Sequence, residues 1–414
     1  ETSCSLMKTI FKTGLFVSRW RGVFTRNLFV LGIETSCDDT GIAIVNSNGD
    51  VHANVLNSQQ KTHSRYGGII PPRAQELHRE NISKVFEQCM QSAQLQPEQL
   101  DAIAVTTRPG LPMSLMIGIR FARHLARKYN KPLVPIHHME AHALQARMEH
   151  RIPYPFLCLL ISGGHCLLSI VRGPREFQLL GFSLDDAPGE AFDKIARRLR
   201  LYLIPKYRSW SGGQAIEDAA RQAEGSHKFE FPLLMAHKRD CNFSFAGLKN
   251  NSVRIITTEE RKLGLPPDCI IPSYKDFCAA VLKATSRHLM NRTQRALEYC
   301  LLRNVFFGSE QRSLVVSGGV ANNDYIFTDI RNLAQEFNCQ TFRPSKKYCC
   351  DNGVMIAWNG IERILDDENS LRWDYDEVEI KGKAQLGKSL VDDVQEANLK
   401  CKWIKAEKRM YEYT

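Results

Sequence analysis

The residues best suited to chemistry are two histidines, His138 and His142, in the run His-Met-Glu-Ala-His. Side chains four apart on a helix project from one face, so both imidazoles can bind a single metal ion. Two imidazoles need a further ligand, and Asp351, which precedes an apolar helix-like segment, offers a carboxylate as well as a helix cap. Because such a His2Asp set suits iron or zinc, we predict one divalent metal ion, with magnesium as a further candidate.

The acid within this run, Glu140, is misplaced for a zinc protease. In the protease motif His-Glu-x-x-His, the glutamate directly follows the first histidine and acts as general base. Glu140 comes one residue later, roughly 200° around the helix from His138, and faces away from the metal. The spacing therefore disfavours metalloprotease activity. We keep Glu140 among the candidate catalytic residues, together with Asp38 and Asp39 in the polar turn after the first strand.

Two glycine pairs, each at the end of an apolar strand, predict anion-binding loops. They are Ser162-Gly163-Gly164 and Ser317-Gly318-Gly319. Glycine lets backbone N–H groups approach a phosphate closely. The second pair is followed by Asn322 and Asn323, whose amides can bind a base or a ribose or cap a helix. A metal site beside two such loops predicts nucleotide chemistry.

A stripe of carboxylates follows in residues 185–194, where Asp186, Glu190 and Asp193 fall on one helix face. A carboxylate at such a position can accept hydrogen bonds from ribose hydroxyls, as in dinucleotide sites. Gly213 and Glu217 add a second point of close approach and another helix carboxylate. These groups are candidates for binding the nucleoside.

The elements that must position these residues alternate between strands and helices in both halves of the chain. Each half begins with three strands, predicted at 29–33, 42–45 and 51–56, and again at 156–161, 166–171 and 177–180. We expect an α/β fold of two duplicated lobes around a cleft, as in the actin-like ATPase and sugar-kinase superfamily. The first predicted lobe spans residues 28–134, and helices from the C-terminal part of the chain are expected to pack on it. The second spans 135–366 with a helical insertion at about 187–305, and a C-terminal extension follows at 367–414.

Composition excludes several other classes. The 13 cysteines are scattered, which disfavours a disulfide framework or a zinc ribbon. No apolar run approaches the roughly 20 residues that span a bilayer, so no membrane association is expected. Residues 1–27 are basic, nearly free of acids and interspersed with aromatic residues, which predicts a mitochondrial transit peptide and a matrix location. The net charge of +10, with basic clusters at 197–208 and 400–409, suits a polyanionic partner.

Seven motifs, in order along residues 28–366, resemble those of the universal tRNA threonylcarbamoyladenosine transferase family. They are residues 32–40 (GIETSCDDT), 137–142 (HHMEAH), 161–165 (ISGGH), 185–194 (DDAPGEAFDK), 242–249 (NFSFAGLK), 317–323 (SGGVANN) and 350–358 (CDNGVMIAW). With the leader, the chain resembles the mitochondrial branch of this family.

The resemblance implies an actin-like fold that binds threonylcarbamoyl-AMP beside a metal ion. The implied metal ligands are His138, His142 and Asp351. The DD turn at Asp38 and Asp39 matches the first phosphate-side hairpin of the family. The implied substrate-binding residues are Leu160, Ile161, Ser162, Gly163, Gly164, Asp193, Gly213, Glu217, Asn322, Asn323 and Cys350.

The resemblance also implies a reaction. The threonylcarbamoyl group passes to N6 of the adenine 3′ of the anticodon in mitochondrial tRNAs that read codons starting with A, and AMP is released. The implied partners are tRNA and a second copy of the chain in a homodimer. Two other classes stay open: a small-molecule kinase on the same scaffold, and a non-catalytic nucleotide-binding scaffold.

The chain departs from the family pattern at three places. Pro188 replaces a commoner alanine, which the first turn of a helix tolerates. The segment 201–211 is longer than in bacterial members. Cys350 replaces a threonine, which raises the hypothesis that oxidation of this thiol regulates the site.

Overall fold

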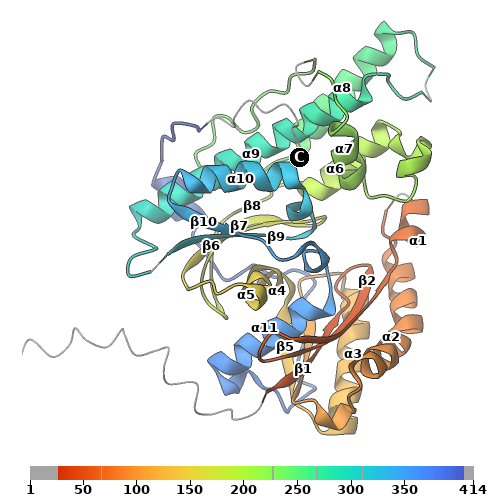
Figure 1. Ribbon diagram of the computed structural model, residues 1–414, viewed down its shortest axis with the longest axis vertical. Coiled ribbons are helices and arrows are strands. Elements are labelled where there is room, and N and C mark those ends of the chain that lie inside the picture. The colour runs from red at the N-terminus through yellow and green to blue at the C-terminus, as the bar shows by residue number, and fades with distance from the viewer. Residues whose placement is uncertain (1–26, 67, 226–227, 267–268, 310, 405–414) are drawn as a thin grey trace, which may run out of the picture.

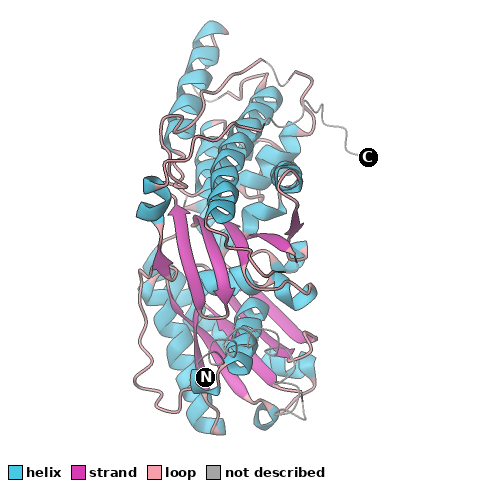
Figure 2. Cartoon of the chain, turned by 90° about the vertical axis from the view of Figure 1, so that its left-hand side faces the viewer, coloured by secondary structure: helices cyan, strands magenta, loops and turns pink. Residues whose placement is uncertain are grey.

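The computed structural model describes residues 27–66, 68–225, 228–266, 269–309 and 311–404, which form two lobes stacked one above the other (Figure 1). The predicted transit peptide therefore lies almost wholly outside the described residues. Each lobe is built on one sheet, and helices cover the outer faces of both sheets (Figure 2). Among the described residues, no helix is long and apolar enough to cross a membrane.

The first lobe contains a five-stranded sheet with the order β3-β2-β1-β4-β5. Strands β1, β2 and β3 form an antiparallel meander, and β4 and β5 continue the sheet parallel to β1. The nearly continuous apolar runs of β1, β2 and β4 fit this sheet, because both of its faces are covered. Their bounds are β1 Phe29–Glu34, β2 Asp39–Asn46, β3 Val51–Ser58, β4 Ala102–Arg108 and β5 Leu133–His137.

The second lobe repeats this topology. Its sheet has the order β10-β9-β6-β7-β8-β11, in which β6, β7 and β8 form the antiparallel meander and β9 runs parallel to β6. Without β11, this is the first lobe's strand order, with β6 in the place of β1. The bounds are β6 Phe156–Ile161, β7 Cys166–Gly173, β8 Glu176–Phe182, β9 Arg312–Ser317, β10 Cys339–Phe342 and β11 Lys388–Ser389. The repeated order confirms the predicted duplicated, actin-like fold.

Helices α2 (Pro71–Ala93) and α3 (Pro112–Tyr129) cover one face of the first sheet, and α11 (Gly353–Asp366) covers the other. Helix α11 packs directly on the backbone of β1. A side chain at Gly32 would come within 2.1 Å of the Gly353 carbonyl oxygen, so only glycine permits this contact. The close contact fixes where α11 begins.

The helices of the second lobe pack around α9 (Tyr274–Leu302), which is buried along almost all of its length. They are α6 Pro188–Arg198, α7 Gly212–Ala220, α8 Ala246–Lys262, α10 Asp324–Gln335 and α12 Val391–Glu396. Short helices complete the chain: α1 Gln60–Arg65, α4 His138–Leu144 and α5 Ala146–Glu149. Helix α4 lies between the two sheets, since Ala141 joins the first lobe's core while Met139 and Ala143 join the second's.

The structure differs from the sequence prediction at several boundaries. The division predicted at residues 134 and 135 falls inside β5, which belongs to the first sheet. Helix α11 lies within the residues predicted for the second lobe. It packs on the sheet of the first lobe, to which C-terminal helices were expected to return. The helix expected from Val320 is a 3-10 turn, Gly319–Asn322, and α10 begins only at Asp324 because Asn323 caps it.

The C-terminal extension contacts both lobes. Val378 joins the core of the first lobe, and Lys381 donates its N–H to the Thr107 carbonyl oxygen at 2.9 Å. Leu386 is buried in the core beneath the second sheet, and β11 then pairs with β8. Residues 382–386 connect the contact of Lys381 with the first lobe to the burial of Leu386 in the second lobe.

Candidate active site

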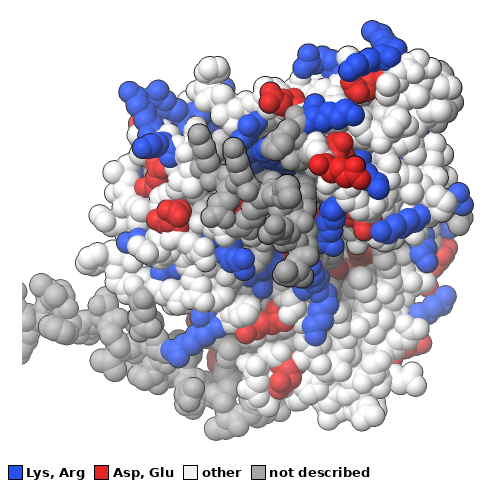
Figure 3. Space-filling view, turned by 45° about the horizontal axis from the view of Figure 1, so that its top comes forward, with Lys and Arg blue, Asp and Glu red and all other residues white. Residues whose placement is uncertain are grey.

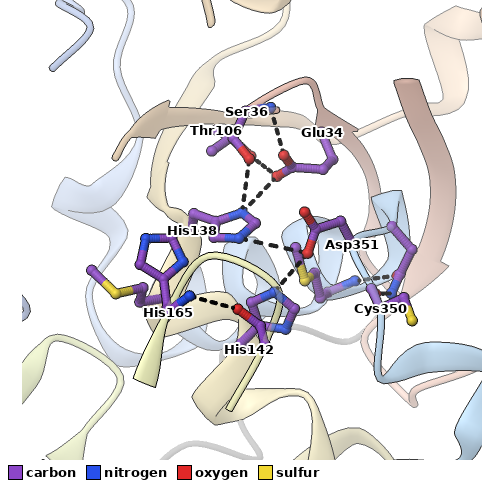
Figure 4. Close-up of polar contacts among 12 residues, drawn as sticks. Glu34, Ser36, Thr106, His138, His142, His165, Cys350 and Asp351 are labelled. Atoms are coloured by element: carbon purple, nitrogen blue, oxygen red, sulfur yellow. Dashed lines mark hydrogen bonds and ion pairs between the residues drawn. The ribbon is translucent and has the colours of Figure 1, made fainter. Parts of the chain in front are cut away.

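Three predicted metal ligands meet between the two sheets. The Nε2 atoms of His138 and His142 lie 3.6 and 2.9 Å from Oδ1 of Asp351 (Figure 4). One donor atom from each residue lies within 4.8 Å of the other two. Two imidazole nitrogens and a carboxylate oxygen, directed at one point and largely buried, match the donors of iron and zinc sites. The residues present therefore fit a divalent ion.

The fold brings these ligands together from distant parts of the chain. Helix α4 starts directly at the end of β5, so His138 and His142 face the interlobe region. Asp351 precedes α11, whose first turn is fixed by Asn352: its Oδ1 accepts the Met355 N–H at 3.0 Å. Gly353 lies so close to β2 that a Cβ atom would be 2.4 Å from the Ala43 nitrogen. This contact holds Asp351 beside the β1–β2 turn.

The electrostatics of the cluster favour a cation. Burial alone would lower the pKa of His138, but the carboxylates of Asp351 and Glu34 raise it to about 9. Burial would raise the pKa of Asp351, yet His138 and His142 hold it well below its usual range. His165, whose ring centroid is 5.8 Å from that of His138, has its pKa lowered to about 4 by burial and by His138. Asp351 is therefore ionised and His165 neutral at physiological pH.

The first glycine loop is a tight turn between β6 and β7. Ser162 N–H donates to the His165 carbonyl oxygen at 2.8 Å, and Ser162 Oγ accepts the His165 N–H at 3.0 Å. Nothing lies within 4 Å of where a Cβ atom would stand on Gly163 or Gly164. The loop thus presents open backbone. The predicted ligands Leu160 and Ile161 precede it with fully buried side chains, so only their backbone can reach a substrate.

Comparison with known proteins identifies the family to which this chain is similar. Residues 50–358 match the family described as tRNA N6-adenosine threonylcarbamoyltransferase. A protein of Drosophila melanogaster, named "Probable tRNA N6-adenosine threonylcarbamoyltransferase, mitochondrial", is 62% identical over 92% of this chain and 95% of its own length. A Xenopus tropicalis protein with the same name, without "Probable", is 45% identical over 91% and 92%.

The chain belongs to the tRNA N6-adenosine threonylcarbamoyltransferase family. It is a transferase of the mitochondrial branch, as its relatives are named. Among solved structures, component A of the (R)-2-hydroxyglutaryl-CoA dehydratase of Acidaminococcus fermentans aligns with a TM-score of 0.47 at 11% identity, over 81% of this chain and 98% of that chain. The strand order described above, and not this likeness, defines the fold.

In this threonylcarbamoyltransferase, two carboxylates that were predicted to bind substrate form hydrogen bonds to the first turns of neighbouring helices. Asp193 Oδ1 accepts the Gly212 N–H at 2.7 Å, at the start of the helix that carries Gly213. Glu217 accepts the Asp324 N–H at 3.2 Å and pairs with Arg221 at 2.7 Å. Burial is the main cause of a raised pKa in both Asp193 and Glu217. The two carboxylates thus join α6, α7 and α10 around the glycine loops.

The second glycine loop places its two asparagines differently. Asn323 Oδ1 accepts the Ile326 N–H at 3.1 Å and so caps α10, which was one of the two predicted roles. Asn322 donates to the Lys346 carbonyl oxygen at 3.3 Å, while its own buried Oδ1 has no hydrogen-bond partner among the described residues. Of the two amides, Asn322 therefore retains an acceptor for a ligand.

Cys350 lies beside this loop, with its Sγ 3.9 Å from Nδ2 of Asn322. Cys350 is exposed as a residue, but desolvation of its sulfur and the charge of Asp351 raise the pKa of the thiol to about 11. The thiolate is the form that oxidants attack, so this environment disfavours the predicted oxidation.

The three candidate catalytic residues have different surroundings. Burial, with the charges of Asp38 and Asp351, raises the pKa of Asp39 to about 7, and one of its oxygens has no partner among the described residues. Burial likewise raises the pKa of Asp38. Glu140 instead forms a buried ion pair with Arg363 of α11. This contact fastens α4 to α11, and Glu140 lies outside the metal cluster, as its spacing from His138 predicts. Its catalytic role stays a prediction.

Sequence reasoning missed the residues that surround His138. Glu34, at the end of β1, lies 3.3 Å from His138 Nδ1, and Ser36 Oγ lies 3.1 Å from the same atom. The available signal was a charged residue closing an otherwise apolar strand. His165 was part of a quoted motif, but no role was predicted for it.

Part of the predicted basic cluster at 197–208 is engaged within the protein. Arg198 pairs with Glu260 at 2.7 Å, and Lys206 pairs with Asp218 at 2.6 Å. On the face of the molecule that Figure 3 displays, acidic side chains likewise lie among the basic ones. Of the second cluster, only Lys400 and Lys402 lie within the described residues.

Proposed function

We propose that this mitochondrial enzyme transfers the threonylcarbamoyl group of threonylcarbamoyl-AMP to N6 of the adenine 3′ of the anticodon in tRNAs that read codons starting with A. The observation that carries the proposal is the His138, His142 and Asp351 cluster, which faces an open glycine loop inside the region matched to the family. The modification of tRNA follows from family membership. The activated donor and the site residues are the parts that we propose.

The donor is a mixed anhydride, so the enzyme needs no strong nucleophile of its own. The N6 amine attacks the carbamoyl carbon, the bond from that carbon to the phosphate oxygen breaks, and AMP leaves with the electron pair. Alignment of the two reactants and stabilisation of charge then supply most of the rate enhancement. Asp39, one of whose buried oxygens has no partner among the described residues, would receive the proton that N6 loses.

His138, His142 and Asp351 would hold the divalent ion, which when bound supplies Lewis acidity and neutralises negative charge. Because two of its three donors are imidazoles, we favour iron or zinc over magnesium. The backbone N–H groups of the exposed Gly163 and Gly164 would bind the phosphate, since the space beside both glycines is open. The Ser162 N–H is engaged by the His165 carbonyl oxygen, so Ser162 would contribute by holding the turn.

The nucleoside of the donor would lie between the helices of the second lobe. Asp193, Gly213, Glu217, Asn322 and Asn323 surround the glycine loops, and Cys350 borders them. Asn322 Oδ1 is the best candidate for a direct contact because it has no partner among the described residues. Asn323, which caps α10, would contribute mainly by fixing this loop.

The direct test is to incubate the purified protein with threonylcarbamoyl-AMP and unmodified mitochondrial tRNA, and then to analyse the nucleosides by mass spectrometry. We expect threonylcarbamoyladenosine 3′ of the anticodon and one AMP for each modified tRNA. Unmodified tRNA after incubation of the metal-loaded protein would refute the proposal. A homodimer is also proposed, and light scattering of the same preparation measures it.

A further inference from the structure

We infer that Glu34 is a positioning residue for the metal site: its carboxylate holds the proton of His138 on Nδ1, so that Nε2 is free to bind the ion. This inference rests on the proposed metal site and deepens it. Glu34 is not one of the three ligands. It acts through His138.

The contacts of Glu34 are all with hydrogen-bond donors. Its Oε1 accepts the Ser36 N–H at 2.6 Å, and its Oε2 accepts the Thr106 hydroxyl at 2.5 Å. The same Oε2 lies 3.3 Å from His138 Nδ1 (Figure 4). Glu34 is only 1% exposed, so no water competes freely for these oxygens. Its position and orientation are therefore fixed by β1, β4 and the β1–β2 turn.

An ionised carboxylate can only accept hydrogen bonds. Contact with Glu34 is therefore favourable when His138 carries a proton on Nδ1 and unfavourable when that nitrogen presents a lone pair. With Nδ1 protonated, the neutral ring has its lone pair on Nε2, which is the atom that faces Asp351 at 3.6 Å. A carboxylate behind a metal-binding imidazole raises the ligand's basicity in the same way.

The second histidine gives an internal contrast. His142 Nε2 faces Asp351 at 2.9 Å, but its buried Nδ1 has no hydrogen-bond partner among the described residues. No described residue accepts a proton from Nδ1 of His142, and without an ion the nearby Asp351 carboxylate favours the proton on Nε2. Of the two imidazoles, His138 is the one whose binding nitrogen is prepared by its surroundings.

The Glu34→Gln variant tests the inference because it keeps the shape but replaces an acceptor by a donor. A glutamine must keep its oxygen toward the Ser36 N–H, which turns its NH2 group toward Thr106 and His138. The His138 proton is then expected to move to Nε2. We expect Zn²⁺ and Co²⁺ to bind the full-length protein about 10- to 100-fold more weakly than wild type.

Two readouts separate this effect from simple destabilisation. Multiple-bond 1H–15N spectra of histidine-labelled, metal-free protein at a pH where His138 is neutral report which nitrogen carries the proton. The control is Glu362→Gln, which removes a similarly buried carboxylate from its pair with Arg147, away from the metal cluster. We expect this control to bind Zn²⁺ as wild type does. Should Glu34→Gln not fold, Glu34→Asp, which keeps the charge but shortens the reach, is measured in the same way.

The outcomes are distinct. Unchanged Zn²⁺ affinity and an unchanged His138 proton position in a folded Glu34 variant would overturn the inference alone. Ser36→Ala is expected to have the smaller effect, and a larger effect than that of Glu34→Gln would assign the role to Ser36 instead. Wild-type protein that binds no Zn²⁺ or Co²⁺ at His142 would overturn the proposed metal site itself.

Discussion

The two lobes close their central hairpins in opposite ways. Strand β1 is connected to β2 by the four-residue turn 35–38, and its counterpart β6 is connected to β7 by the four-residue turn 162–165. The first turn follows the buried Glu34, whose carboxylate contacts a metal-binding histidine. The second consists of Ser162, two open glycines and a neutral His165. The repeated topology thus has two equivalent turns, of which one contacts the proposed metal ligand His138 and the other exposes the two glycines proposed to bind phosphate.

The largest expected effect comes from removing one residue of the proposed metal cluster, which separates its role from that of the glycine loop. His142→Ala removes a proposed metal ligand, so we expect metal affinity and turnover to fall by more than about 100-fold. Metal content by mass spectrometry and tRNA modification measure this. Retained turnover in a metal-free, folded variant would assign catalysis to the glycine-loop side alone.

Glu140→Ala tests whether Glu140, the buried acid of α4, has a structural role. The change leaves Arg363 buried without its partner, and we expect the free energy of unfolding to fall by about 3–5 kcal/mol. Zn²⁺ affinity of the folded protein should stay near that of wild type. Denaturant titration and metal titration check the two parts, and lost tRNA modification without lost stability or metal affinity would support the predicted catalytic role.

Two glycine substitutions probe the two turns directly. A Cβ atom at Gly110 would be 2.5 Å from the Ser36 carbonyl oxygen, so Gly110→Ala should destabilise the protein by about 1–3 kcal/mol. Gly164→Ala meets no atom within 4 Å and should change stability by less than about 0.5 kcal/mol. It should instead raise the KM for threonylcarbamoyl-AMP about tenfold, because the methyl group occupies space beside the phosphate-binding N–H groups. Equal effects on stability would contradict the contrast between the turns.

The effect that is smallest at neutral pH concerns a histidine of the second lobe's core, His288. Burial, with Arg292, lowers the pKa of His288 to about 3, and its Nε2 accepts the Ser244 N–H at 3.2 Å. Unfolding lets this ring take up a proton below pH about 6.5, so the free energy of unfolding falls as the pH decreases from there toward 3. His288→Gln should show a shallower decline, by up to about 1.4 kcal/mol per pH unit, in denaturant titrations. An identical pH profile would show that His288 is not buried neutral.

Much of the site could be predicted because its chemistry is local in the sequence. The four-residue spacing of His138 and His142 and the glycine pairs after apolar strands are set by short-range geometry. Glu34 and Arg363 were not assigned, because their partners are distant in the chain and become neighbours only when β1, α4 and α11 pack. The start of α10 was misplaced because the capping role of Asn323 depends on the 3-10 turn before it.

The C-terminal segment has a mechanical consequence for the interlobe site. Its attachment through Lys381 to β4 and its attachment through Leu386 to the second lobe are only a few residues apart. While both attachments stay formed, a link of so few residues limits how far the lobes can separate beside it. An opening of the interlobe site that keeps both attachments is therefore widest on the side farthest from residues 382–386.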